Sequence, residues 1–369
     1  MTRLDAMLKR AVAGATLATD ELEYLLQLED PAENRELFAA AYEVKRREVG
    51  TGVYLRGLIE TSNLCTRDCR YCGIRKSNTR VRRYELALEE IVAGAKLAAD
   101  FGYGAAVLQG GERSDPEFIR FVTAAVRRIG ELPNAPELTL SFGEQTLDTC
   151  RQWREAGAVR YLLRIETTDP GLYAALHPEG TLDGRKAALG RLRAAGFQVG
   201  TGVMIGLPGQ SARMLARDVE FFRSVDADMI GMGPWIPHRD TPLGIAHPGT
   251  RADNLRRLEL GLRMIAVTRL QLRDVNIAAT TALQSIAPAD GRERGLLAGA
   301  NVIMPNVGGL EHRADYTLYD GKAGMDENAA ETRRKLDESL ARIGEAVRYG
   351  VAGTPLHYLK RTGQSSAGK

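Results

Sequence analysis

Short apolar segments alternate with helical patterns along most of this chain, and this alternation constrains the fold more than any other feature. Eight apolar runs have the length and composition of buried strands, at residues 53–60, 105–109, 138–142, 161–166, 199–205, 229–232, 275–280 and 301–304. Between them, apolar residues recur at helical spacing, for example at 88–101, 118–129, 185–195 and 212–225. Eight strand–helix units over about 250 residues predict an α/β fold, a (β/α)8 TIM barrel.

Further segments flank the predicted barrel, which occupies residues 51–320. Residues 1–50 are polar and helical in pattern, with Thr19 or Asp20 as a candidate helix cap, and predict an N-terminal helical extension. Residues 321–369 predict a charged C-terminal helical tail, whose last stretch, 363–369, should fray. In such a barrel the site lies at the C-terminal ends of the strands, so the segments that follow the eight runs hold the candidate residues.

Charge and hydropathy exclude several classes of partner. The net charge of +3 is too small to indicate binding to nucleic acid or to a membrane surface. The chain also has no apolar run of about 18 residues and no signal-peptide pattern. We therefore expect a cytoplasmic protein with neither a nucleic-acid nor a membrane partner.

Three of the four cysteines lie close together, directly after the first predicted strand. Cys65, Cys69 and Cys72 form a C-x3-C-x2-C pattern, which favours reduced metal-binding thiols, because a disulfide framework would spread and pair its cysteines. Thiolates ligate iron–sulfur clusters, normally one per iron, so three of them leave one iron of a [4Fe-4S] cluster open. A structural zinc site would need a fourth ligand, and the loop has no histidine; three unpaired structural thiols are the other alternative. Cys150 falls in a helical stretch, where we expect a buried, inert thiol.

With Tyr71 at the aromatic position, C-x3-C-x-Φ-C is the signature of the radical S-adenosylmethionine (SAM) superfamily. Further blocks, in the same order, resemble the [FeFe]-hydrogenase maturase family HydE: 56–63 (RGLIETSN), 71–75 (YCGIR), 161–167 (YLLRIET), 205–210 (IGLPGQ), 233–238 (GPWIPH), 279–282 (ATTA) and 300–306 (ANVIMPN). Biotin synthase and methylornithine synthase are the nearest relatives in this group.

The resemblance implies a cofactor set and a reaction. One [4Fe-4S] cluster would bind SAM through its open iron, and an electron from a flavodoxin or ferredoxin would split SAM into methionine and a 5′-deoxyadenosyl radical. No protein residue is expected to be catalytic beyond the cluster and SAM. The residues implied to bind SAM are Tyr71, Gln109, Gly110, Gly111, Glu112, Ser141, Arg164, Glu166, Arg185, Gly206 and Leu207.

Some of these assignments also have a physical argument. Glu112 follows two glycines that permit close backbone approach, and it either accepts from the methionyl ammonium or is solvated in a plain turn. Arg164 and Glu166 alternate on the fourth predicted strand, so both should face the barrel interior, as SAM ligands or as a buried ion pair. By resemblance, Glu166 holds the ribose hydroxyls and Arg164 lies near the methionyl part. By resemblance, Arg185 also clamps the SAM carboxylate, whereas a surface helix residue is the alternative.

Gly206 and Leu207 begin the segment that follows the fifth predicted strand. Their backbone would pack against adenine by resemblance, whereas an ordinary strand-to-helix turn is the alternative.

A substrate cavity is expected from Arg160, Thr280, Thr281, Met304 and Tyr319. The two threonines and Met304 close the seventh and eighth predicted strands, and Arg160 begins the fourth and should point inward. A cation, hydroxyls and a thioether, with no acidic residue among them, suit a small anionic organometallic substrate. The resemblance implies an iron–cysteine complex bearing carbonyl and cyanide, handled together with the other hydrogenase maturases during assembly of the H-cluster.

The chain departs from the family pattern at several positions. No cysteine follows Cys150, so we expect no second cluster. Ile165 stands where relatives often have His, and Gly110 where they often have Ser. Two alternatives remain: a lysine mutase similar to methylornithine synthase, which also needs one cluster, and a non-catalytic iron–sulfur carrier. A carrier would need neither Glu166 nor Arg185.

Overall fold

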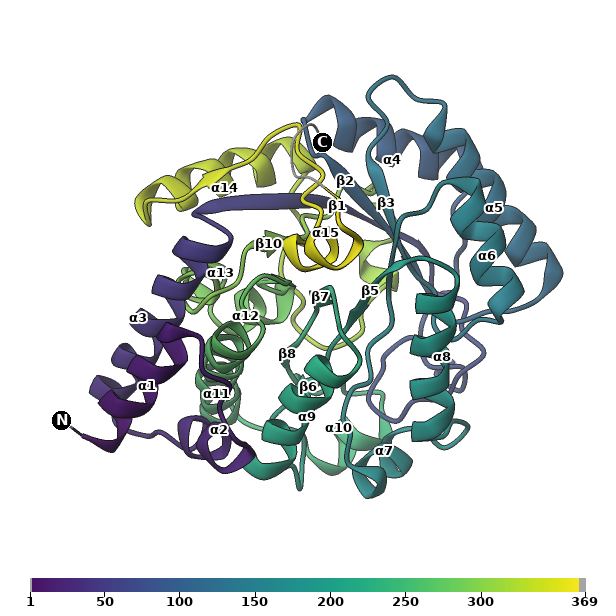
Figure 1. The fold of residues 1–369 in the computed structure, drawn as a ribbon. Helices are drawn as coiled ribbons and strands as arrows, with labels where there is room; N and C mark the ends of the chain where they lie inside the picture. Colours follow the sequence, from purple (N-terminus) through teal and green to yellow (C-terminus); the bar gives the residue numbers. More distant parts are fainter. Residues whose placement is uncertain (1, 365–369) are drawn as a thin grey trace.

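The computed structural model describes residues 2–364, and its centre is a parallel eight-stranded barrel (Figure 1). The strands follow the order β10-β1-β2-β3-β4-β5-β7-β9. Their bounds are β1 Gly52–Ser62, β2 Ala105–Gly110, β3 Glu137–Ser141, β4 Arg160–Leu162, β5 Gln198–Thr201, β7 Met229–Ile230, β9 Asn276–Ile277 and β10 Val302–Ile303. The bridge between Ala278 and Val302, beside the hydrogen bond from Asn301 N to Ile277 O, joins β9 to β10. The predicted (β/α)8 barrel is therefore confirmed.

Two short strands extend the barrel towards the C-terminal ends of its strands. They are β6 (Met204–Ile205), which follows β5, and β8 (Gly233–Pro234), which follows β7, and they pair with each other in parallel. The predicted run 199–205 therefore includes the break between β5 and β6, and the predicted run 229–232 ends within the break between β7 and β8.

Helices surround the sheet and bury their apolar faces against it (Figure 1). In α5, Asp115 caps the first turn by accepting from Phe118 N, and Pro116 occupies the first helical position. The outer helices are α4 Leu88–Asp100, α5 Pro116–Gly130, α6 Leu147–Ala156, α7 Pro170–Leu176, α8 Leu182–Ala194, α9 Ala212–Ser224, α10 Pro242–Ala246, α11 Arg251–Gln271, α12 Thr281–Ile286 and α13 Gly291–Leu297. Among residues 2–364, no helix is long and apolar enough to cross a membrane.

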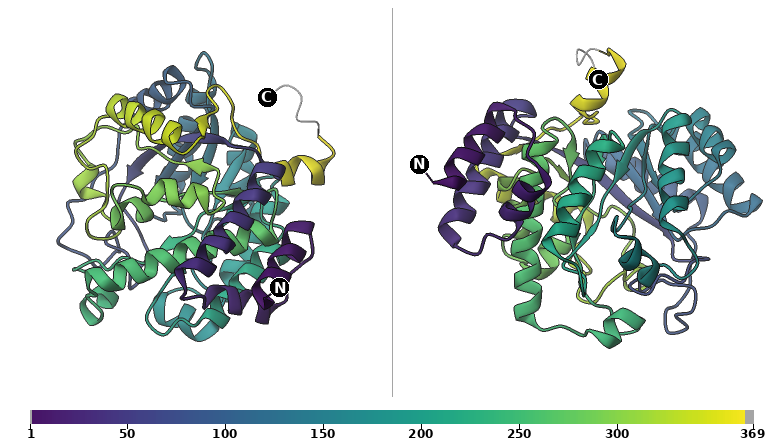
Figure 2. Two further views of the ribbon diagram at one scale, coloured as in Figure 1. Left: turned by 90° about the vertical axis from the view of Figure 1, so that its left-hand side faces the viewer. Right: turned by 60° about the horizontal axis from the view of Figure 1, so that its bottom comes forward.

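The N-terminal segment forms three helices that lie together on one side of the barrel (Figure 2). These are α1 (Arg3–Ala13), α2 (Thr19–Leu26) and α3 (Pro31–Glu48), and they pack on α9 and α11. The cap of α2 is Ala18, one residue before the predicted position, and Glu21 accepts from Ala18 N.

The C-terminal segment is only partly helical. A 3-10 turn (Arg313–Asp315) precedes this segment, which contains α14 (Ala329–Arg342), β11 (Ala346–Val347) and α15 (Leu356–Thr362). The prediction of an all-helical tail missed β11, which adds to β1 in parallel. After β11, Gly353 O accepts from Asn276 Nδ2 at 2.7 Å, so this segment covers the N-terminal ends of the barrel strands. The fraying predicted for 363–369 falls mostly on residues 365–369, outside the described residues.

Candidate active site

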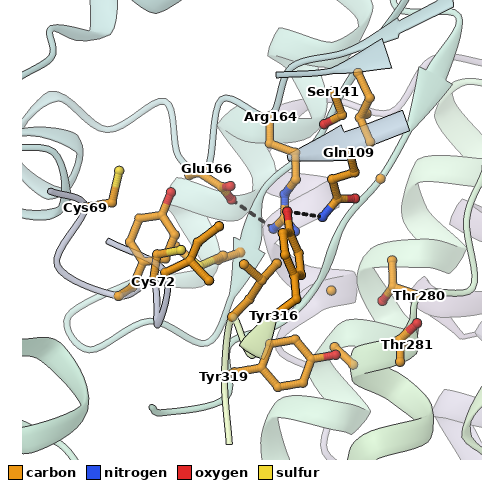
Figure 3. A pocket seen from close by; sticks show the side chains of 18 of the residues that line it. Cys69, Cys72, Gln109, Ser141, Arg164, Glu166, Thr280, Thr281, Tyr316 and Tyr319 are labelled. Atoms are coloured by element: carbon orange, nitrogen blue, oxygen red, sulfur yellow. Dashed lines mark hydrogen bonds and ion pairs between the residues drawn. The ribbon is translucent and has the colours of Figure 1, made fainter. Parts of the chain in front are cut away.

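A cavity of about 320 Å³ opens at the C-terminal ends of the barrel strands, where the barrel architecture predicts a site. Its volume falls in the range of small-molecule pockets. Most of the residues expected from the sequence line it: Cys65, Cys69, Tyr71, Cys72, Gln109, Gly110, Gly111, Glu112, Ser141, Arg164, Glu166, Arg185, Thr280, Thr281, Met304 and Tyr319. Figure 3 shows cysteines on one side of the cavity and Thr280, Thr281 and Tyr319 on the other.

The cysteine loop forms one wall of this cavity, and its thiols are free. Cys65 Sγ accepts backbone N–H groups of Arg67 and Glu112 at 3.4 and 3.3 Å, which favours a thiolate. Burial raises the pKa of the Cys69 thiol to about 12 and raises the pKa of Cys72 as well. A bound cation would stabilise the thiolate form of these partly buried thiols, and an iron–sulfur cluster supplies one.

The spacing of these thiols bears on the kind of metal group they fit. Within residues 2–364, no three His, Cys, Asp or Glu side chains converge closely enough to hold a single metal ion. Three cysteines that line one cavity provide one thiolate for each of three irons of a cluster. Cys150 lies buried on α6 and does not line the cavity, as expected for an inert thiol.

Gly111 allows the cysteine loop to rest against the end of β2. A Cβ at this position would lie 2.1 Å from Leu64 O, so no other residue fits without moving the loop. Thr66 fastens the same loop, since both its backbone N and its Oγ1 donate to Glu112 O at 2.9 Å. Gly111 of the Gln-Gly-Gly-Glu block thus positions the cysteine loop.

Two ion pairs fix charged side chains in the cavity wall near the cysteines. Glu112 Oε1 accepts from Arg67 Nε at 2.5 Å, and Glu144 Oε1 accepts from Arg185 Nε at 2.7 Å. Arg185 also donates to Arg164 O at 2.6 Å, and its guanidinium is largely buried. The structure therefore places Arg185 in the site and not on the surface. Arg67 was not among the site residues expected from the sequence, although its position between Cys65 and Cys69 could have indicated it.

Arg164 and Glu166 form the pair that alternation predicted. Arg164 Nη2 lies 2.8 Å from Glu166 Oε2, but the two atoms are not aligned as a hydrogen bond, and both are buried without such a partner among the described residues. Glu166 has φ of +65°, a left-handed conformation that a residue with a side chain rarely adopts. Burial raises the pKa of Glu166, opposed by Arg164 and Arg185. Unsatisfied polar atoms in a cavity wall fit a ligand rich in hydroxyls, such as a ribose.

Tyr71 is held by a histidine that the sequence did not single out. Its hydroxyl lies 3.2 Å from His177 Nε2, and His177 Nδ1 lies 3.1 Å from Tyr173 O. Burial lowers the pKa of His177 to about 4, so the ring is neutral. A neutral ring that donates from Nδ1 to the carbonyl must accept at Nε2 from the tyrosine hydroxyl, which orients the Tyr71 ring.

The far end of the cavity contains a further ion pair that sequence reasoning missed. Lys322 donates to Glu60 Oε1 and, at 3.0 Å, to Tyr316 O, and all three residues line the cavity. The substrate positions expected from the sequence include no acidic residue, but Glu60 also lines this cavity. The sequence predicts only a strand at 53–60 and places Lys322 in the C-terminal tail, so neither pattern indicates this ion pair. Nearby, Thr280 Oγ1 is buried without a hydrogen-bond partner in the described chain.

Three expected site residues lie elsewhere. The assignment of Arg160 to the substrate cavity is corrected: its fully buried side chain donates to Gln198 Oε1 at 2.9 Å and pairs with Glu137, at the N-terminal ends of the strands. Because Arg160 lies at the start of β4, its long side chain reaches partners at the nearer, N-terminal end of the barrel. Gly206 and Leu207 do not line the cavity either; both N–H groups donate to Gln210 Oε1, as in a turn.

Comparison with known proteins agrees with this geometry. Residues 59–222 match the family model described as the Radical SAM superfamily. The chain is 43% identical over 302 residues to the [FeFe] hydrogenase maturase subunit HydE of Thermotoga maritima, which covers 82% of this chain and 83% of that protein. It is 32% identical over 301 residues to a biotin synthase of Geobacter sulfurreducens, with 79% and 84% covered. A crystal structure of methylornithine synthase (PylB) matches with a TM-score of 0.78 at 25% identity, covering 93% of this chain and 98% of that one.

Proposed function

Because this chain belongs to the HydE family of [FeFe]-hydrogenase maturases within the radical SAM superfamily, we propose that its substrate is a small anionic iron–cysteine complex bearing carbonyl and cyanide. The radical would act on the cysteine part of that complex during assembly of the H-cluster. The observation that supports this proposal most strongly is the convergence of three thiols, Glu112, Arg185 and Glu166 on one cavity.

Cys65, Cys69 and Cys72 would hold a single [4Fe-4S] cluster. When bound, the reduced cluster supplies the electron that breaks the C5′–S bond of SAM, which gives methionine and a 5′-deoxyadenosyl radical. The chain's own contribution is to bind and orient SAM and to keep water from the radical. A flavodoxin or ferredoxin would deliver the electron.

In this proposal, each charged residue of the wall binds a different group of SAM. Glu112, fixed by Arg67, would accept from the methionyl ammonium, and Arg185, fixed by Glu144, would donate to the carboxylate. Glu166 would accept from the ribose hydroxyls with its unsatisfied Oε2. Each group is held by a partner before SAM arrives, so little rotamer freedom is lost on binding.

The substrate would bind beyond SAM, between Arg164 and the opposite wall. Arg164 Nε is buried without a hydrogen bond in the described chain, as is Thr280 Oγ1, so both can donate to an anion. With Arg160 outside the cavity, Arg164 takes over the role of substrate cation in our proposal. Thr281, Met304 and Tyr319 would complete the wall.

One observation favours a second candidate, a lysine mutase similar to methylornithine synthase. Glu60 provides a carboxylate in the cavity, which could hold the side-chain ammonium of lysine. However, Lys322 already pairs with it, so that carboxylate is not free.

A direct comparison of substrates tests the proposal. Reconstituted enzyme with SAM and a reductant is given either lysine or the iron–cysteine complex. We expect a paramagnetic adenosylated intermediate from the iron complex, and support for hydrogenase activation when the partner maturases are added. Formation of methylornithine from lysine, with no such intermediate, would establish the mutase instead.

A further inference from the structure

Beside the SAM cavity lies a second chamber of about 30 Å³. Leu58, Thr281, Met304 and Lys322 line both spaces and form the partition between them. The chamber is bounded by α13 on one side and by the loop 308–327 on another. Each of these two walls carries an arginine that the proposed function does not use.

Arg292, on α13, is a partly buried cation without a partner. Its Nε is fully buried, and its guanidinium makes no hydrogen bond or ion pair within residues 2–364. Burial lowers the pKa of Arg292, although Tyr319 and nearby carboxylates oppose this. A partly buried guanidinium that no carboxylate contacts is incompletely stabilised, so the position favours binding of an anion.

Arg313 brings a second guanidinium to the same chamber and is only 4% exposed. It donates to Gly324 O at 2.6 Å, to Glu327 O and to Gly308 O, which holds the loop 308–327 in its folded form. Its Nε is buried and has no acceptor in the described chain. One N–H of Arg313 therefore remains for a ligand.

The other charges of the chamber are already neutralised. Lys322 pairs with Glu60, and Glu327, a carboxylate in the chamber wall, pairs with Lys335 at 2.8 Å. The two arginines thus have no carboxylate paired with them in the described chain, although Glu293 and Glu327 lie near Arg292, and Glu60 and Glu327 lie near Arg313. We propose that this chamber binds a compact oxoanion, whose oxygens accept from Arg292 and Arg313 and so tie the loop 308–327 to α13.

Binding there would act on the neighbouring cavity. The loop carries Tyr316, Tyr319 and Lys322, which form one wall of the SAM cavity. An anion that fastens the loop orders that wall without touching SAM or the substrate. This inference does not depend on which substrate the enzyme uses.

Anion binding to the reconstituted holoenzyme tests the inference. Inorganic phosphate and acetate, titrated calorimetrically at constant ionic strength, distinguish a tetrahedral oxoanion from a carboxylate, and chloride serves as the control anion. We expect saturable one-to-one binding of at least one oxoanion and none of chloride. Hydrogen exchange in the loop 308–327 should slow when the anion is bound.

Variants on α13 show whether the binding is at this chamber. Arg292→Gln should weaken binding at least 10-fold and abolish the slower exchange, whereas Arg292→Lys should retain part of the affinity. Arg294→Gln is the matched control, because Arg294 lies on the same helix but pairs with Glu259 at 2.5 Å. Since Arg292 has no partner in the described chain, its replacement should not impair folding. No saturable binding, or equal binding by Arg292→Gln, would mean an adventitious ion only and would overturn the inference. SAM cleavage is not a readout here, so failure of the proposed function would be seen separately.

Discussion

Glu166 Oε2 lies 2.8 Å from Arg164 Nη2 in the cavity wall, yet neither atom makes an aligned hydrogen bond within residues 2–364. The left-handed backbone of Glu166 turns its carboxylate into this position. A strained, unsatisfied carboxylate beside the cysteine wall is prepared to accept hydrogen bonds from a ligand.

Replacing Glu166 by Gln should therefore weaken SAM binding without removing the cluster. Loss of a charge-assisted hydrogen bond, worth roughly 1.5–3 kcal/mol, corresponds to about 10-fold to 100-fold in affinity. The dissociation constant of SAM, measured on reconstituted enzyme, checks this. Glu131→Gln, at an exposed position after α5, is the control. An unchanged SAM affinity in Glu166→Gln would remove Glu166 from the proposed SAM site.

The cysteines of the loop should be ligands of the cluster, whereas Cys150 should not be. We expect about four irons per chain after anaerobic reconstitution, because three thiolates bind three irons of a [4Fe-4S] cluster and leave the fourth open. Cys69→Ala should abolish SAM cleavage, whereas Cys150→Ala, at a buried position on α6, should retain iron and activity. Iron analysis and 5′-deoxyadenosine formation measure both. About eight irons, or a single zinc, would contradict the assignment.

Gly111→Ala should disturb the cysteine loop. The added methyl group would lie 2.1 Å from Leu64 O, which is backbone and cannot move aside cheaply. We expect reduced iron content and a lower melting temperature. Gly190→Ala on α8 is the matched control: its Cβ meets nothing within 4 Å, and alanine is favoured over glycine in a helix by about 0.5–1 kcal/mol. Equal iron content in both variants would show that Gly111 does not position the loop.

Arg160→Ala should act on stability and not on substrate binding. Arg160 is fully buried, and its loss leaves Glu137 and Gln198 without their partner. We expect a decrease in the free energy of unfolding of roughly 3 kcal/mol, at the lower end for a broken buried pair because Glu137 is partly exposed. Urea denaturation measures this, with Arg120→Ala at an exposed site on α5 as the control. A stable variant with weakened substrate binding would restore the cavity role.

The attachment of α15 should depend on pH through His357. Its Nδ1 lies 3.1 Å from Asp274 Oδ1 and its Nε2 lies 2.6 Å from Asp226 Oδ1, so both nitrogens donate only when the ring is charged. The hydrogen bond to Asp274 is the main cause that raises the pKa of His357, and burial opposes it. Lys360 and Arg361 face the same carboxylates.

A raised pKa fixes the sign of the effect. The stabilisation is fully present below the unfolded pKa of about 6.5 and is lost as pH rises through the higher folded value. Hydrogen exchange in α15 should therefore accelerate as pH rises above neutrality, after correction for the intrinsic rate. His357→Gln should exchange faster at low pH and lose this dependence. The same pH profile in both proteins would exclude His357 as the titrating group.

Local patterns in the sequence were sufficient for the barrel and for much of the site. Apolar periodicity defines strands and helices, and the C-terminal ends of parallel strands meet in a barrel, so Glu112, Glu166 and Thr280 could be placed in one cavity beforehand. The cluster loop was also readable, because its cysteines are neighbours in the chain. Both inferences depend on spacing over a few residues.

Tertiary structure alone decided which distant side chains pair and towards which end of the barrel they point. Arg160 turned to Glu137 at the N-terminal ends of the strands, Lys322 came from the tail to Glu60, and β11 joined β1. The physical reason is that long charged side chains can reach either end of a strand, and burial requires each charge to find a partner wherever the folded chain provides one. Packing between segments up to hundreds of residues apart determines that partner, as with Glu60 and Lys322. Local periodicity in the sequence therefore cannot predict it.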